Sequence, residues 1–260
     1  MTTRGELLTI AIQAARVGGG TIVAAGRTRE GVEKSAGDYV TAVDSASERA
    51  IAGFLLEATP DIPLVGEERG GPTSDRYWLV DPLDGTTNFL HGFPVVAVSV
   101  ALVEQGRPTV GVVEAPFLHE TYAGADGLGA TLERADGSTE RLAVATRSVD
   151  RAVVGTGFPF RHKEVLPRYY RALYAALERF EDLRRPGAAA LDLAWVAAGV
   201  FDGFFELALG PWDVAAGAVL IREAGGMVTD WSGADDVLTG DILAGPPAVH
   251  AELLRIATET

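Results

Sequence analysis

Residues Tyr77–Phe93 read Tyr-Trp-Leu-Val-Asp-Pro-Leu-Asp-Gly-Thr-Thr-Asn-Phe-Leu-His-Gly-Phe, and they set the interpretation of the whole chain. The apolar run at 78–80 predicts a buried strand that ends at Asp81. Pro82 fixes its own φ and pushes the preceding residue toward extended geometry, so a helix cannot continue through it. Gly85 then permits a turn that a residue with a Cβ would resist. The stretch therefore predicts a strand followed by a tight, non-helical turn.

That turn carries two carboxylates, Asp81 and Asp84, with the Leu83 carbonyl between them. Oxygen ligands at this spacing suit Mg²⁺ or Mn²⁺ rather than zinc or copper. Residues 85–87, Gly-Thr-Thr, add free backbone N–H groups and hydroxyls where a helix can begin, which is a suitable cradle for phosphate. Asp-x-x-Asp-Gly alone is usually a surface turn. Acids this close repel each other unless a cation joins them, which favours the metal interpretation here.

A related signature, Asp-x-Asp-Gly-Thr, belongs to phosphatases that form an aspartyl-phosphate. In this chain the two acids are one residue further apart. That signature also closes the first strand of its domain, whereas Asp81 comes far along the chain. Both differences argue against an aspartyl-phosphate enzyme.

The composition limits the partners. The net charge of −14 disfavours nucleic acid or an anionic membrane as a partner, because both would be repelled. An anionic substrate meets the same repulsion, and bound divalent cations are the usual remedy. The absence of cysteine excludes disulfides, thiolate metal sites and a cysteine nucleophile. The four scattered histidines disfavour a histidine-ligated metal.

The length of 260 residues and the 47% hydrophobic content suit one large globular unit or two closely packed domains. The N-terminus lacks a signal-peptide pattern, and we expect no segment long enough to span a bilayer. These features predict a cytoplasmic protein.

The first half of the chain predicts helices followed by an antiparallel meander. Apolar residues at helical spacing predict a helix over residues 5–25, with Gly18–Gly20 at a close packing contact. Ser45-x-x-Glu48 resembles a capping box that opens a helix to about Ala58, which would place Asp44 just outside the helix. Residues 96–132 alternate as strands joined by turns, which predicts an antiparallel sheet.

The second half alternates strands with helices, which is typical of α/β layering. We expect strands near 153–155, 181–184, 202–206, 227–229 and 242–244, and helices near 165–180, 188–198, 213–223 and 248–257. The change of pattern predicts two parts, an α+β part over residues 1–145 and an α/β part over residues 146–260.

Four segments, in order, resemble the inositol monophosphatase family. The central one is Asp-Pro-x-Asp-Gly-Thr-x-x-Phe at residues 81–89, the metal-binding signature of that family. The others are Lys34-x-x-x-Asp38-x-Val40-Thr41-x-x-Asp44, Gly66-Glu67-Glu68, and Pro211-Trp212-Asp213-x-Ala215-Ala216-Gly217 running on to Glu223-Ala224-Gly225-Gly226. One such segment carries little weight, but four in order make the resemblance specific.

The resemblance implies a layered α-β-α-β-α sandwich, a homodimer, inhibition by lithium, and two or three Mg²⁺ ions with Mn²⁺ as a substitute. The implied metal ligands are Glu67, Asp81, the Leu83 carbonyl, Asp84 and Asp213. The implied catalytic residues are Thr86, Asp44 and Glu67, with Thr86 and Asp44 orienting and helping to deprotonate the attacking water. The implied substrate-binding residues are Asp84, Gly85, Thr86, Ala188, Ala189, Glu206 and Asp213.

Some of these residues have plainer explanations. From its position alone, Asp213 could equally be the N-cap of an Ala-rich helix. Glu206 matches a glutamate that binds inositol hydroxyls in the family, and a carboxylate does accept hydrogen bonds from hydroxyls. It could also be an acid at a strand end. Lys34 is a candidate for the water network around the metal, although a single lysine is usually a solvated charge.

The resemblance implies a Mg²⁺-dependent phosphomonoesterase that releases inositol and phosphate from inositol monophosphate. Ala188 stands where the family has Ser or Thr, which removes a polar contact and leaves the substrate preference open. Thr87-Asn88 and Glu206 favour inositol phosphates over the alternatives, histidinol phosphate and sugar phosphates such as fructose 1,6-bisphosphate. An alternative of another class is a regulatory binding protein in an RNA-processing or transcription complex.

Overall fold

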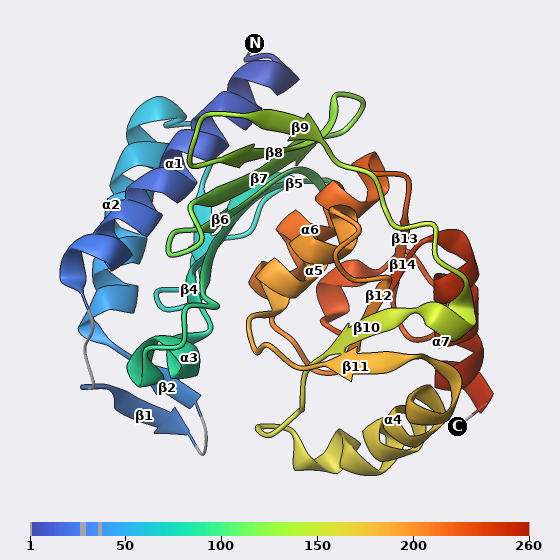
Figure 1. The fold of residues 1–260 in the computed structure, drawn as a ribbon. Helices are drawn as coiled ribbons and strands as arrows, with labels where there is room; N and C mark the ends of the chain where they lie inside the picture. Colours follow the sequence, from blue (N-terminus) through green and yellow to red (C-terminus); the bar gives the residue numbers. More distant parts are fainter. Residues whose placement is uncertain (1, 27–29, 36–37, 260) are drawn as a thin grey trace.

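The computed structural model describes residues 2–26, 30–35 and 38–259, without the side chains of residues 34, 35 and 38. The elements form five layers, α-β-α-β-α (Figure 1), as the resemblance implied. Two helices cover the outer face of a seven-stranded sheet, two lie between the sheets, and two cover the far face of a five-stranded sheet. In that order the pairs are α1 (Arg4–Ala25) and α2 (Ala42–Ala58), α5 (Ala189–Ala197) and α6 (Pro211–Glu223), and α4 (Leu166–Arg179) and α7 (Pro247–Glu259).

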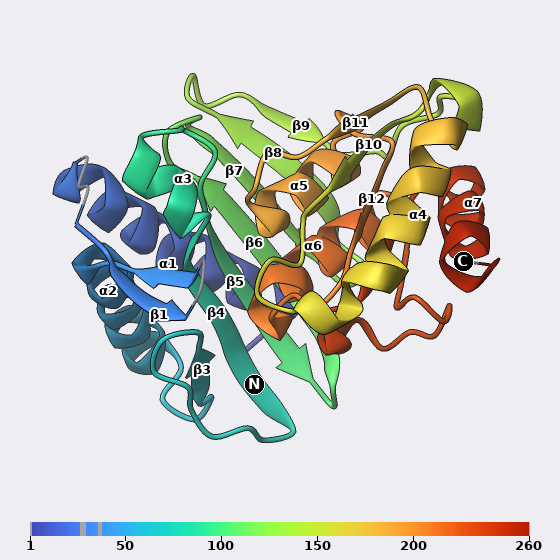
Figure 2. The same cartoon turned by 90° about the horizontal axis from the view of Figure 1, so that it is seen from below.

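Each interface between layers has its own apolar core. One core packs α1 and α2 on the first sheet, a second fills the space around α5 and α6, and a third lies under α4 and α7. Figure 2 shows α4 and α7 on the side away from α1 and α2. Both faces of each sheet are therefore covered, which explains why most strand residues are buried on either face.

The seven-stranded sheet follows the chain order, from β3 to β9. The strands are β3 (Leu64–Gly66), β4 (Arg76–Asp84), β5 (Ala97–Glu104), β6 (Arg107–Ala115), β7 (Glu120–Ala125), β8 (Gly129–Arg134) and β9 (Thr139–Arg141). All neighbours are antiparallel except β3 and β4, which are parallel. The predicted meander is confirmed.

The five-stranded sheet has the order β11-β10-β12-β14-β13. Its strands are β10 (Val153–Thr156), β11 (Asp182–Arg184), β12 (Gly203–Glu206), β13 (Met227–Thr229) and β14 (Ile242–Gly245). β11, β10 and β12 are parallel, whereas β14 pairs antiparallel with both β12 and β13. The chain passes from one sheet to the other after Arg141; the division into residues 1–145 and 146–260 stays a prediction.

The remaining described elements are short. They are β1 (Val32–Ser35) and β2 (Asp38–Val40), which pair antiparallel, α3 (Thr86–His91), and three 3₁₀ turns at Val149–Arg151, Lys163–Val165 and Val237–Thr239.

α1 continues through its three glycines, and two of them make the expected close contacts. A Cβ on Gly18 would lie 2.7 Å from Ile51 Cδ1 of α2, and one on Gly19 would lie 2.9 Å from Glu114 Cγ of β6. The absent side chains let α1 approach both neighbours. α1 is also long and apolar enough to cross a bilayer, with a mean hydropathy of 1.5 over 18 residues, so the expectation of no such segment is wrong. Its buried face belongs to the core over the first sheet.

Three of the predicted boundaries that differ from the structure affect residues of the predicted site. α2 begins at Ala42 with Thr41 as its N-cap, and Asp44 is the third residue of the helix, so the capping box lies one turn before the predicted Ser45. Strand β4 continues to Asp84, although its pairing with β5 is irregular between Asp81 and Asp84. α6 begins at Pro211, so Asp213 lies inside its first turn rather than at the N-cap.

Candidate active site

A cleft of about 620 Å³ brings both halves of the chain together. It is lined by the loop after β3, the ends of β4 and β12, and the first turns of α3, α5 and α6. All the predicted site residues line this cleft except Asp44, which lies behind Thr86. The side chain of Lys34 lies outside the described residues.

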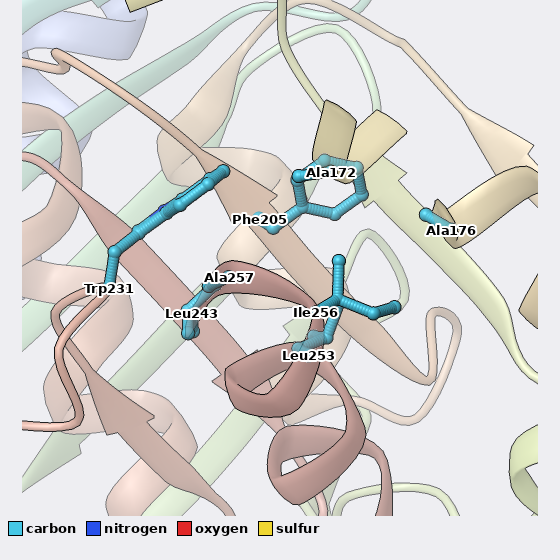
Figure 3. Close-up of a pocket in the computed structure, with 8 residues that line it drawn as sticks. All are labelled: Ala172, Ala176, Phe205, Trp231, Leu243, Leu253, Ile256 and Ala257. Atoms are coloured by element: carbon cyan, nitrogen blue, oxygen red, sulfur yellow. The ribbon is translucent and has the colours of Figure 1, made fainter. Parts of the chain in front are cut away.

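A second gap has a different character. Eight apolar residues surround it between α4, α7 and the five-stranded sheet, among them Phe205, Trp231 and Leu243 (Figure 3). It has no room for a water molecule. We regard it as a packing gap, since it offers no polar group to a ligand.

Three carboxylates form the centre of the cleft. Asp81 and Asp84 come from β4 and Asp213 from α6, and each offers one oxygen within 4.8 Å of the others. The register of the parallel strands adds Glu67: Gly66 pairs with Val80, and the Glu67 N–H donates to the Val80 carbonyl at 3.0 Å. Strand pairing therefore sets Glu67 beside Asp81.

The burial and close approach of these carboxylates raise the pKa values of Asp81 and Asp84. Burial raises the pKa of Asp81 well above its usual value, and the charges of Glu67, Asp84 and Asp213 raise it further. The pKa of Asp84 rises to about 7, chiefly through burial and then through Asp213. Protons or a cation must neutralise such a group.

Asp84 also joins the two halves of the chain. Its Oδ2 accepts a hydrogen bond from the Ala190 N–H at 2.7 Å, in the first turn of α5. The positive end of the α5 dipole favours negative charge there. Backbone amides of α5 accordingly oppose the rise in the pKa of Asp84. Ala188 and Ala189 line the cleft beside this contact.

Thr86 lies between a buried acid and the carboxylate cluster. Its Oγ1 is 3.1 Å from Asp44 Oδ1 and 3.2 Å from the Leu83 carbonyl oxygen. The Asp44 side chain is fully buried, and its Oδ2 accepts from the Thr41 N–H at 2.8 Å and the Thr41 hydroxyl at 2.5 Å. The capping contact that starts α2 therefore also orients Asp44 toward Thr86.

Gly85 has a backbone conformation that favours glycine, as the sequence predicted. Its φ is +87°, and a Cβ would lie 2.9 Å from the Val95 carbonyl oxygen, so a side chain would be both strained and obstructed. Asn88 secures the same turn, because its Nδ2 lies within 3.2 Å of the carbonyl oxygens of Val95, Pro186 and Gly187. No helical carbonyl precedes the first N–H groups of α3, so these groups are candidates to bind a ligand.

The wall of the cleft opposite β4 is also acidic. Burial raises the pKa of Glu206 to about 8, with Asp213 acting in the same direction and Arg185 opposing it. Gly157 makes room for this carboxylate, since a Cβ there would lie 2.0 Å from both oxygens. Sequence patterns missed Asp192, which lines the same cleft from α5. The available signal was a single acid within an otherwise apolar helix.

The donor set fits a hard divalent cation. Asp81, Asp84 and Asp213, with Glu67 and the Leu83 carbonyl nearby, offer only oxygen ligands. Mg²⁺ and Mn²⁺ prefer such ligands. The raised pKa of Asp81 supports the fit, because a cation would relieve the repulsion that raises it. The residues present can therefore hold a metal ion.

The five-layered fold and its acid-lined cleft are those of the phosphatase-type proteins that use metal ions. Residues 4–260 match the family model described as the inositol monophosphatase family. The chain belongs to the inositol monophosphatase family.

Relatives and solved structures agree with this assignment. The Nus factor SuhB of Escherichia coli is 42% identical over 257 residues, covering 95% of this chain and 94% of the relative. The extragenic suppressor protein suhB from Bartonella henselae has a TM-score of 0.88 at 37% identity, covering 96% of this chain and 98% of that one. The inositol monophosphatase from Anabaena has a TM-score of 0.86 at 35% identity, covering 98% and 96%.

Proposed function

We propose that this protein is a Mg²⁺-dependent phosphomonoesterase that hydrolyses inositol monophosphate to inositol and phosphate. The observation that carries the proposal is the contact between Thr86 and Asp44 at the edge of the carboxylate cluster. A cluster that only bound a metal would not need a hydroxyl backed by a buried acid.

Asp81, Asp84, Asp213, Glu67 and the Leu83 carbonyl would hold the cations, two or three in number. Bound Mg²⁺ supplies a water of lowered pKa and offsets the negative charge on the phosphate. A chain of net charge −14 needs that offset to attract an anionic substrate.

The chain's own groups account for the proton. Thr86 has one hydroxyl hydrogen, which it can donate to Asp44, leaving its oxygen to accept a hydrogen bond from the attacking water. As the water gives its proton to the Thr86 oxygen, Thr86 can pass its own hydroxyl proton to Asp44 Oδ1, while Thr41 holds Asp44 through Oδ2. Thr86 and Asp44 would thus orient the water and help to deprotonate it. Glu67 is the third proposed catalytic residue.

The organic half of the substrate would lie toward the opposite wall. The amides of Gly85 and Thr86 would bind the phosphate, and Ala188 and Ala189 would line its path. Asp84, Asp213 and Glu206 would contact the hydroxyls, since carboxylates accept the hydrogen bonds that hydroxyls donate. The position of Glu206 supports this role, because its buried side chain lines the cleft.

Phosphate release with Mg²⁺ from five substrates tests the proposal: inositol 1-phosphate, histidinol phosphate, fructose 1,6-bisphosphate, NADP⁺ and 3′-phosphoadenosine 5′-phosphate. We expect the highest kcat/KM for inositol 1-phosphate, with all activity lost in EDTA. A preference for another substrate would keep the metal chemistry and reject the inositol assignment. In that case the first position to mutate is Ala188, where a hydroxyl residue would restore the side chain found in the family.

A second candidate rests on the relatives. Several carry the name Nus factor SuhB at about 40% identity over nearly the whole chain, which favours a regulatory binding role as the alternative. Asp81→Asn separates the two functions. If the variant without hydrolysis still performs the cellular role of the wild type, and the protein captures the same partner without Mg²⁺, binding is the main function.

The proposal includes three further properties expected of the family: a homodimer, inhibition by lithium and a cytoplasmic location. Light scattering, phosphate release in LiCl and cell fractionation measure them directly. Direct nucleic-acid binding is not expected, because the chain carries 36 acidic and 22 basic side chains.

A further inference from the structure

Asp192 is a buried acid that none of the roles above uses. It lies in α5 with 1% of its surface exposed, yet it lines the cleft. Its Oδ1 is buried and has no hydrogen-bond partner within the described part of the chain. Native proteins rarely leave a buried carboxyl oxygen unpaired, so such an atom indicates a partner that the protein alone does not supply.

The neighbours of Asp192 do not neutralise it. Burial raises the pKa of Asp192 well above its usual value, and the charges of Asp84 and Glu206 act in the same direction. Arg185 opposes them only in part. The Arg185 guanidinium lies over the ring of Phe158 at 5.4 Å, and no ion pair between it and Asp192 is present among the described residues. Asp192 thus lines the cleft with one carboxyl oxygen, Oδ1, that has no hydrogen-bond partner among the residues the structure describes.

The chemistry of a carboxyl group selects the kind of partner. A neutral carboxyl can donate a hydrogen bond, and an ionised one can only accept. A substrate hydroxyl satisfies either form, because it both donates and accepts. A phosphate oxygen would be repelled by the ionised form. The group therefore suits the hydroxyl-bearing half of a substrate.

We propose that Asp192 is a specificity-determining residue that hydrogen-bonds a hydroxyl of the substrate's organic half, on the same wall as Glu206. The inference rests on the proposed phosphomonoesterase function, and it adds Asp192 to the acids proposed to contact the substrate hydroxyls, Asp84, Asp213 and Glu206. Two acids from different elements, β12 and α5, can contact different hydroxyls of one polyol. This arrangement favours a polyol phosphate over a phosphomonoester with an apolar leaving group.

Three variants test the role. Asp192→Ala and Asp192→Leu remove the hydrogen-bonding group, and Leu keeps the volume filled in case Ala does not fold. Asp192→Asn keeps a group that both donates and accepts. Asp202→Asn is the control, because Asp202 is equally buried but is paired with Arg147 and does not line the cleft. Circular dichroism and thermal unfolding establish that each variant is folded.

The first readout is the ratio of kcat/KM for inositol 1-phosphate to kcat/KM for 4-nitrophenyl phosphate, whose ring carries no hydroxyl. We expect the ratio to fall by at least about tenfold in Asp192→Ala and Asp192→Leu, because both variants lose the hydrogen bond to a substrate hydroxyl. It should fall by less than about threefold in Asn, which keeps a bonding partner, and stay unchanged in Asp202→Asn. An equal loss on both substrates, or no loss, would overturn the inference.

The second readout is the affinity for myo-inositol, measured by calorimetry with Mg²⁺ and phosphate present. The Kd should rise in Ala and Leu by a factor similar to the fall in the ratio. This measurement does not depend on hydrolysis, so it tests the role of Asp192 separately from the proposed phosphomonoesterase function. If wild type hydrolyses no member of the substrate panel, the proposed function fails, and the calorimetry still decides the role of Asp192: an unchanged Kd in both variants, or no binding by wild type, rejects it.

Discussion

The Thr86 hydroxyl lies 3.1 Å from Asp44 Oδ1, joining the first turn of α3 to the first turn of α2 across 42 positions of the chain. Two more side chains of α2 secure the same region. Ser47 Oγ donates to the Pro82 carbonyl at 2.9 Å, and Glu48 Oε2 accepts from the Glu68 N–H at 2.8 Å. One face of α2 thereby holds two segments of the cleft, the loop after β3 and residues 82–86, in fixed positions.

The contact between Thr86 and Asp44 predicts a defect in turnover rather than in binding. Asp44→Asn should lower kcat by about 10²–10⁴-fold, the usual range for loss of a general base, with little change in KM. Thr86→Ala should behave similarly, whereas Thr86→Ser, which keeps the hydroxyl, should retain most activity. Steady-state kinetics measure this. Equal kcat values for Thr86→Ala and Thr86→Ser would show that the hydroxyl has no role.

Asp81→Asn should abolish hydrolysis and leave the fold intact. Without metal, the variant should unfold at the same or a higher temperature than wild type, because one buried like charge is gone. Mg²⁺ should raise the Tm of wild type, since a ligand at a hundredfold excess over its Kd stabilises by about 2.7 kcal/mol. The variant should lose most of that rise. Calorimetry with and without Mg²⁺ makes the comparison, and full turnover by Asp81→Asn would contradict the metal-site assignment.

The raised pKa of Asp84, about 7 against a usual 3.8, predicts a pH dependence with a definite sign. The folded, metal-free protein holds a proton on this group that the unfolded chain has already released. Its stability should therefore fall as the pH rises from about 4 to about 7. Denaturant titrations of the metal-free protein across this range measure the slope.

Mg²⁺ binding should show the opposite trend. The cation binds the ionised carboxylates, so its affinity should weaken as the pH falls through about 7, and binding should release protons. Calorimetry in two buffers with different ionisation enthalpies counts those protons. Binding without proton release at pH 6 would mean that these carboxyls are already ionised in the metal-free protein.

Gly111 allows α6 to pack closely against β6. A Cβ there would lie 2.4 Å from the Ala216 carbonyl oxygen, so Gly111→Ala must push α6 away from β6. We expect a loss of about 1–3 kcal/mol from this overpacking, together with weaker Mg²⁺ binding, because α6 carries Asp213. Gly53→Ala on the exposed face of α2 is the matched control, and it should gain about 0.5–1 kcal/mol. Denaturant unfolding distinguishes them; equal stability of the two variants would contradict the packing argument.

Local sequence patterns predicted much of the fold. Alternating apolar residues identified the meander, and the alternation of strands with helices identified the second sheet and its helices. The errors fall at element ends. Ser45-x-x-Glu48 and Thr41-x-x-Asp44 have equivalent capping patterns, and local sequence does not rank them. The buried contact of Asp44 with Thr86 favours the helix that starts at Ala42.

The sequence by itself determined the ligand chemistry of the cleft. The spacing of Asp81 and Asp84, the proline between them and the positive φ at Gly85 are local properties, because they depend on the backbone of adjacent residues. The tertiary structure alone decided which distant groups meet them. The bond from the Ala190 amide to Asp84 and the unpaired Oδ1 of Asp192 depend on how α5 packs between the sheets. Burial and charge proximity, which set the pKa values of these acids, arise only from that packing.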